Sequence, residues 1–290
     1  MLLSSFIREG TESLGSLYPE REAHGIVLML CEALLGTSSY THLVEPGTVV
    51  EPAALAGLEA AMGRLLDGEP VQYVLGYADF CGFRFRVTPD VLIPRQETEQ
   101  LVRAAVAEAA CLWRDAAPLR VLDLCTGSGC IAWSVALLVP GTEVVAVDVS
   151  EAALGVARSQ GFAASPAPLF LQADILDTEQ DFDLGMFDII LSNPPYIMES
   201  ERALMHRNVL EHEPELALFV PDADPLVFYR AAARWSQRFL SPDGCAFVEI
   251  NERLGGETEE VFRSAGFPET SVVKDIFERN RFVRFSKNAL

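Results

Sequence analysis

The residues that could do chemistry begin with a glycine-rich turn inside the stretch VLDLCTGSGCIAW, residues 121–133. An apolar strand pattern ends at Asp123, and a helical pattern follows Gly129. Glycine at 127 and 129 lets the backbone approach a ligand where a Cβ atom would block it. The free N–H groups at the start of the helix can bind a carboxylate or a phosphate. The turn therefore predicts a ligand site at the end of a strand.

A second acid, Asp148, closes the next predicted strand, VVAVDVS, roughly 20 residues after the glycine turn. An acid at that spacing can accept hydrogen bonds from both ribose hydroxyls of a nucleoside. Taken alone, the glycines could simply form a tight turn, and Asp148 could simply be a surface acid. Together they favour a nucleoside cofactor. The turn departs from the dinucleotide pattern GxGxxG, because Cys125 stands where the first glycine would be.

The decisive motif is Ser192-Asn-Pro-Pro-Tyr-Ile197, which follows the predicted strand FDIIL and so lies at its carboxyl end. A planar amide or ring-amino nitrogen is a poor nucleophile because its lone pair is delocalised. The Asn193 side-chain oxygen and the Pro194 carbonyl can accept its two N–H groups and favour a more pyramidal nitrogen as charge develops. Prolines stiffen the loop, and Tyr196 can pack on the flat group. The motif predicts transfer to such a nitrogen, mainly by positioning.

The elements that must hold these motifs alternate between strand and helix patterns from about residue 97 onwards. Such alternation predicts a mostly parallel sheet covered by helices on both faces. Residues 271–285 instead predict a terminal hairpin that adds an antiparallel strand. The expected strands cover 119–124, 143–147, 169–172, 187–192 and 244–250, and the expected helices cover 150–159, 225–239 and 253–265.

Two further regions precede the alternating one. Residues 1–70 carry helical apolar stripes, at 20–35 and between Pro52 and Gly68, and predict a small helical bundle. The bundle is either a packing module or a docking surface for a partner. The alternating residues 83–87, FRFRV, predict a strand of a hairpin. We therefore expect a helical partner-docking domain over 1–70, a β-hairpin connector over 71–96 and a catalytic α/β domain over 97–290.

Composition and charge limit the classes of function. The chain has 290 residues, half of them hydrophobic and 22% charged, which excludes bulk disorder. A formal net charge of −20 repels phosphate backbones at long range. No apolar stretch reaches the roughly 20 residues of a membrane span, and no signal peptide is expected. Six scattered cysteines without a CxxC pair predict reduced thiols in a cytoplasmic protein, with no metal site.

The glycine turn resembles the cofactor loop of class I methyltransferases, which bind S-adenosylmethionine. Five further stretches stand out along the chain: DGEPVQYVLG (67–76), LIPRQETE (92–99), SNPPYI (192–197), EPELA (213–217) and KDIFERNR (274–281). Many methyltransferases share NPPY, but few combine it with an IPR-x-[DE]-T-E segment. Through these stretches, and over nearly its whole length, the chain resembles the bacterial release-factor glutamine N5-methyltransferases of the HemK/PrmC type.

The resemblance implies a Rossmann-like fold and methylation of the glutamine in the Gly-Gly-Gln loop of peptide-chain release factors. It also implies that the helical N-terminal domain contacts the release factor. Cys125 departs from the family, since many members carry glycine there, and its thiol narrows the pocket near the methionine end. The implied glutamine site consists of Asn193, Pro194, Pro195 and Tyr196. The implied cofactor site consists of Cys125, Thr126, Gly127, Ser128, Gly129, Asp148, Asp174, Ile175 and Asn193.

Three other readings remain open from the residues alone. A nucleic-acid amino-methyltransferase, acting on adenine N6 or guanine N2, faces the same chemical problem but needs a basic groove. Residues 174–188 contain acids and no Lys or Arg, so we expect a protein substrate, no direct nucleic-acid binding, no membrane and a monomer. The intact Asn193 counts against a cofactor-binding module without turnover, and the glycine spacing counts against a nicotinamide-linked oxidoreductase. His206 and His212 fit surface residues better than a general base.

Overall fold

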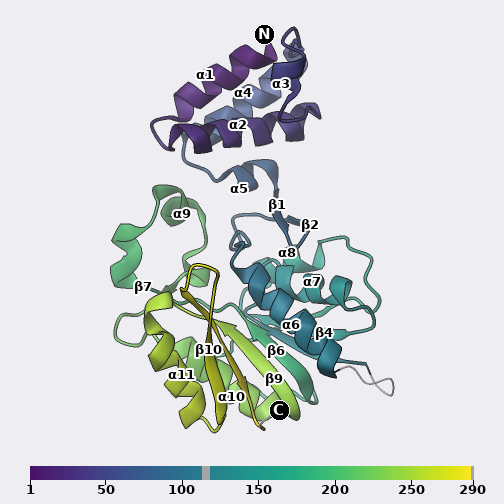
Figure 1. The fold of residues 1–290 in the computed structure, drawn as a ribbon, viewed down its shortest axis with the longest axis vertical. Coiled ribbons are helices and arrows are strands. Elements are labelled where there is room, and N and C mark those ends of the chain that lie inside the picture. The colour runs from purple at the N-terminus through teal and green to yellow at the C-terminus, as the bar shows by residue number, and fades with distance from the viewer. Residues whose placement is uncertain (113–117, 289–290) are drawn as a thin grey trace. The chain divides into compact units, whose positions relative to one another are not determined.

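A computed structural model describes residues 1–112 and 118–288 of the chain (Figure 1). The chain forms two compact units. The first comprises Met1–Tyr77 with Met205–His212, and the second comprises Ala78–Leu204 with Glu213–Leu290. Among the described residues, no helix combines the length and apolar character that a membrane crossing requires. Nor does any cluster of three or more His, Cys, Asp or Glu in this part of the chain have the geometry to hold a metal ion.

The N-terminal unit is helical, as its apolar stripes predict. The core of the unit consists of aliphatic side chains from successive helices, with Leu14, Leu30 and Leu58 fully buried. The longest of these helices runs over Glu20–Leu35 and is followed by Gly36, whose φ of +68° favours glycine. The helices are α1 (Leu3–Leu14), α2 (Glu20–Leu35), α3 (Thr41–Val44), α4 (Pro52–Leu66), α5 (Val71–Leu75) and α9 (Arg207–His212).

The second unit is built on a seven-stranded sheet with the order β10-β11-β9-β6-β3-β4-β5. Its central strands run parallel, while β11 is antiparallel to both neighbours. The sequence predicts that the terminal hairpin adds an antiparallel strand to the sheet. In the structure that strand is β11, and the other strand of the hairpin, β10, joins the sheet as well. The strands are β3 (Arg120–Leu124), β4 (Glu143–Asp148), β5 (Leu169–Gln172), β6 (Phe187–Ser192), β9 (Leu240–Glu249), β10 (Glu269–Lys274) and β11 (Asn280–Ser286).

Smaller elements complete the second unit. The FRFRV alternation forms one strand of a two-stranded hairpin, in which Phe85 is fully buried and its arginine neighbours are exposed. Two other short strands pair in parallel and form a sheet separate from the seven-stranded one. The small strands are β1 (Tyr77–Phe80), β2 (Phe83–Arg86), β7 (Ile197–Met198) and β8 (Phe219–Val220), and the 3-10 helices are η1 (Glu199–Leu204), η2 (Glu215–Ala217) and η3 (Glu252–Leu254).

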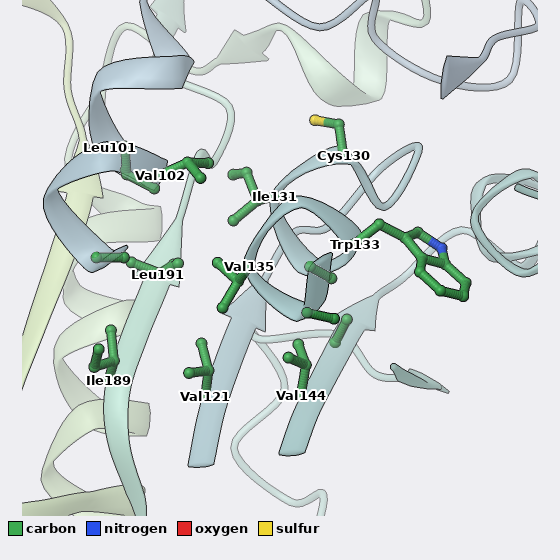
Figure 2. Packing of buried hydrophobic residues seen from close by; sticks show 14 of the residues in the cluster. Leu101, Val102, Val121, Cys130, Ile131, Trp133, Val135, Val144, Ile189 and Leu191 are labelled. Carbon is green, nitrogen blue, oxygen red and sulfur yellow. The ribbon is translucent and has the colours of Figure 1, made fainter. Parts of the chain in front are cut away.

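Helices cover both faces of the sheet, so the central strands consist of almost unbroken apolar residues. On one face, Figure 2 shows Val135 over Val121 and Leu101 near Leu191. Trp133 is buried there, as expected, and its Nε1 donates a 2.8 Å hydrogen bond to the Ala157 carbonyl. The first face carries α6 (Thr98–Leu112), α7 (Cys130–Leu138) and α8 (Glu151–Arg158), and the second carries α10 (Val227–Phe239) and α11 (Gly255–Ser264).

Candidate active site

The carboxyl ends of the parallel strands β3, β4 and β6 meet at one edge of the sheet. A cavity of about 210 Å³ lies there. Most of the predicted site residues line it, although they come from different strand ends. Those in the lining are Cys125, Thr126, Gly127, Ser128, Asp148, Asp174, Ile175, Asn193 and Pro195, whereas Gly129, Pro194 and Tyr196 are not part of it.

The two glycines of the turn have different surroundings. Gly127 has a φ of +55°, lines the cavity, and has open space where a Cβ would stand. Its N–H donates a 2.8 Å hydrogen bond to Asp148 Oδ2, which ties the turn to the end of β4. Gly129 also has a positive φ, but its Cβ would lie 3.0 Å from that of Ala157. Gly129 therefore allows close packing of α7 on its neighbour.

A residue outside the predicted site also supports the turn. The Gln160 side-chain amide donates a 2.9 Å hydrogen bond to the Ser128 carbonyl. Its Oε1 accepts from the Arg86 N–H at 2.8 Å, and its Nε2 donates to the Arg86 carbonyl at 3.0 Å. One side chain thus links the β1–β2 hairpin to the cofactor turn. A lone glutamine after a helix gives no sequence signal for this role.

Acidic groups surround the turn. Burial raises the pKa of Asp148, and backbone N–H groups that donate to it, including those of Ser150 and Gly127, oppose the shift. Burial raises the pKa of Asp123 to about 7, although the Thr126 hydroxyl donates a 2.6 Å hydrogen bond to its Oδ2. Within the described residues, the other oxygen of Asp123 has no hydrogen-bond partner. Carboxylates with spare acceptor capacity suit a ligand that carries hydroxyl, ammonium or sulfonium groups.

The NPPY loop joins the cavity to a buried polar network. Asn193 Nδ2 donates a 3.2 Å hydrogen bond to Thr98 Oγ1, which donates at 2.7 Å to Glu249 Oε2. The Tyr196 hydroxyl donates to the other oxygen, Glu249 Oε1, at 3.1 Å. Burial and the nearby Glu249 carboxylate raise the pKa of Tyr196. Burial also raises the pKa of Glu249, against the hydrogen bonds that it accepts. The Tyr196 hydroxyl is therefore engaged away from the cavity.

Sequence reasoning named Thr98 only as part of the LIPRQETE stretch and missed Glu249. A charged residue inside the apolar strand pattern FVEI was the available signal, because fully buried acids need partners. His206 and His212 belong to the segment grouped with the N-terminal unit, and neither lines the cavity.

The comparisons with known proteins show the family of the chain. Residues 5–76 match the family described as PrmC N-terminal domain, and residues 109–216 match the Methyltransferase small domain. The release factor glutamine methyltransferase of Bacteroides thetaiotaomicron is 38% identical, over 97% of this chain and 98% of the relative. The release factor glutamine methyltransferase of Flavobacterium psychrophilum is 37% identical, over 98% of this chain and 99% of the relative. The chain belongs to the release factor glutamine methyltransferase family.

This release factor glutamine methyltransferase family member has the fold of class I methyltransferases. The catalytic domain of hMettl16, solved in complex with a 3′UTR hairpin, has a TM-score of 0.53 and 13% identity, over 82% of this chain and 83% of that chain. The protein is an S-adenosylmethionine-dependent methyltransferase. The cavity fits that cofactor, since the Asp148 carboxylate lines it and can accept hydrogen bonds from hydroxyl groups.

Proposed function

We propose that the protein methylates the side-chain amide nitrogen of the glutamine in the Gly-Gly-Gln loop of peptide-chain release factors. One observation carries the proposal: Asn193, the predicted amide-binding residue, lines the same cavity as Gly127 and Asp148, the predicted cofactor residues. A nitrogen held by Asn193 would therefore stand beside the cofactor. The curated relatives, which bear the name of this activity, support the same substrate.

The chain's own residues would bind and orient the two reactants. The turn from Cys125 to Gly129 and Asp148 hold the nucleoside, while Asp174 and Ile175 hold the adenine. When bound, S-adenosylmethionine would supply a methyl group from a sulfonium centre, which would become a neutral thioether, and the methylated nitrogen would release one N–H proton to solvent. Asn193 Oδ1 and the Pro194 carbonyl accept the two N–H groups of the glutamine amide and hold its nitrogen toward the methyl donor.

Pro195 forms the far side of the amide pocket, and Tyr196 supports that side indirectly. Pro195 lines the cavity directly. Tyr196 acts from behind the loop, because its hydroxyl is bonded to Glu249. The prolines limit the backbone freedom of the loop, so that the two acceptors are in place before substrate arrives.

The remaining parts of the chain take supporting roles in this proposal. Residues 1–70 dock the release factor, and residues 71–96 connect this domain to the catalytic domain. Residues 97–290 carry out the methyl transfer. The protein works as a monomer in the cytoplasm, does not bind nucleic acid directly and does not associate with a membrane. Its described cysteines are free thiols, which suits a reducing compartment. The acids between 174 and 188, ahead of the NPPY loop, disfavour a nucleic-acid substrate.

A methyl-transfer assay with labelled S-adenosylmethionine tests the proposal. The assay offers a release factor, its Gly-Gly-Gln variant with Gln→Ala, and single-stranded and duplex DNA in parallel. We expect label in the release factor alone, and none in the Gln→Ala variant. Label in DNA with none in either protein would overturn the substrate. Asn193→Ala should abolish transfer while cofactor binding, measured by calorimetry, stays within about threefold of the unmodified protein.

A further inference from the structure

Three side chains from distant parts of the sequence form a hydrogen-bonded chain that ends at the NPPY loop. Thr98 stands at the start of α6, Asn193 follows β6, and Glu249 ends β9. Thr98 and Glu249 are buried, with 2% and 3% of their surfaces exposed. Asn193 is only half-buried and lines the cavity. The network therefore runs from the core to the candidate site.

While Glu249 is ionised, donor and acceptor counting fixes the direction of every hydrogen bond in this chain. An ionised carboxylate can only accept, so Glu249 requires that both hydroxyls beside it donate. Thr98 donates to one oxygen at 2.7 Å and Tyr196 donates to the other at 3.1 Å. With its only proton committed to Glu249, the Thr98 oxygen can only accept a hydrogen bond from Asn193. The Asn193 amide must therefore turn its NH₂ group toward Thr98.

The same counting leaves the Asn193 oxygen available. Nδ2 lies 3.2 Å from Thr98 Oγ1, and in the described part of the chain Oδ1 has no hydrogen bond. The two ends of an amide point in different directions, so the oxygen is directed away from Thr98. If the Asn193 amide were rotated by half a turn, its NH₂ group would take the position of Oδ1. A substrate NH₂ would then meet a second donor and lose its acceptor.

We propose that Thr98 and Glu249 are positioning residues that hold the Asn193 amide with its oxygen toward the substrate nitrogen. This inference rests on the proposed function, because it assigns the Asn193 oxygen to the glutamine NH₂. Glu249 lies outside the cavity lining, and Thr98, which is part of that lining, contacts the Asn193 amide. Their effect passes through the orientation of one amide, and it should be expressed in kcat rather than in cofactor binding.

The first test compares Thr98→Val with Thr98→Ser. Valine keeps the shape of threonine but has no hydroxyl, so the amide loses the acceptor that sets its orientation. We expect Thr98→Val to lower kcat by about 10- to 100-fold, with an unchanged Kd for S-adenosylmethionine. Serine retains the hydroxyl and should recover most of that loss. Equal losses in the two variants, or full activity in Thr98→Val, would overturn the inference.

Thr258→Val is the matched control for structural damage. Thr258 is a fully buried threonine in α11, and within the described residues its hydroxyl has no hydrogen-bond partner. The control loses a buried hydroxyl in the same way without touching the network, so kcat should not change. A loss of kcat in Thr258→Val as large as that in Thr98→Val would show a general effect of packing.

A double-mutant cycle with Asn193→Asp separates orientation from structure. A carboxylate has an acceptor at both ends, so it has no donor end to misdirect. We expect Thr98→Val to cost less than about threefold in kcat when residue 193 is aspartate. The same cost in both backgrounds would contradict the inference. Failure of the proposed function would look different, because the unmodified protein itself would then leave the release factor unlabelled.

Discussion

Arg95 and Glu213 form an ion pair with 2.7 Å between Nη2 and Oε1, although they lie 118 positions apart in the sequence. The Glu213 side chain is 1% exposed, while Arg95 is 34% exposed. The second carboxylate oxygen accepts a 3.2 Å hydrogen bond from the Ile93 N–H. Arg95 and Pro214 both line the cavity. The pair therefore joins two cavity-lining segments from separate parts of the chain.

Arg95→Gln should destabilise the fold and weaken cofactor binding. The buried Glu213 carboxylate would lose its charged partner and keep only its backbone hydrogen bond, which costs about 1–3 kcal/mol of unfolding free energy. Loosening of the two lining segments should also raise the Kd for S-adenosylmethionine. Urea unfolding and calorimetry measure the two effects. Arg84→Gln is the control, because Arg84 pairs with Asp79 on the surface, and an equal effect there would contradict the prediction.

Cys125→Gly and Cys125→Val should differ in stability. Cys125 has a φ of +61°, a conformation that glycine adopts freely and a β-branched residue strongly avoids. We expect glycine to keep or slightly raise the unfolding free energy, and valine to lower it by about 2 kcal/mol. Cys245→Val is the control, since Cys245 is buried in a strand, where β-branching is favoured. Equal stability of the two Cys125 variants would refute this explanation.

Asp123 should make stability depend on pH. Burial raises its pKa to about 7 in the folded protein, whereas an unfolded aspartate titrates near pH 4. The folded state thus retains a proton that the unfolded chain has lost. The resulting stabilisation is complete below about pH 4 and is lost as the pH rises through about 7.

The measurement is the unfolding free energy without cofactor, from pH 5 to pH 8, for the unmodified protein and Asp123→Asn. Asparagine does not titrate, so the difference between the two proteins isolates Asp123. We expect the advantage of the unmodified protein to shrink by about 3 kcal/mol across this range. A difference that stays constant with pH would show that Asp123 titrates as it does in the unfolded chain.

An exposed apolar patch on the N-terminal unit offers a test of the docking role. Tyr40, Leu43 and Val44 lie at α3, with 67%, 67% and 71% of their surfaces exposed. Exposed apolar clusters of this kind mark interaction surfaces. Leu43→Asp should raise the KM for the release factor by about tenfold and leave kcat unchanged. Glu59→Gln, at an exposed position of α4, is the surface control, and a loss confined to kcat would contradict a docking role.

Much of the fold could be predicted, because local periodicity reports local structure. The expected boundaries of Glu20–Leu35, Leu169–Gln172 and Phe187–Ser192 match α2, β5 and β6. The prediction was weaker where the pattern was irregular. Strand β9 begins at Leu240, four positions before the expected start, and the short helices between 199 and 217 have no clear apolar stripe. Short elements take their conformation from tertiary contacts, which a single stretch of sequence does not contain.

The sequence by itself determined which chemical groups stand at the strand ends. Asp148 and Asn193 follow apolar strand patterns, and parallel pairing brings such ends to one edge of a sheet. Only the tertiary structure decided which way the Asn193 amide turns. Its partner Thr98 meets Glu249 across 151 positions of sequence, and that contact depends on the packing of α6 beside β9. Local patterns record burial and period, whereas hydrogen-bond partners follow from strand order and helix packing.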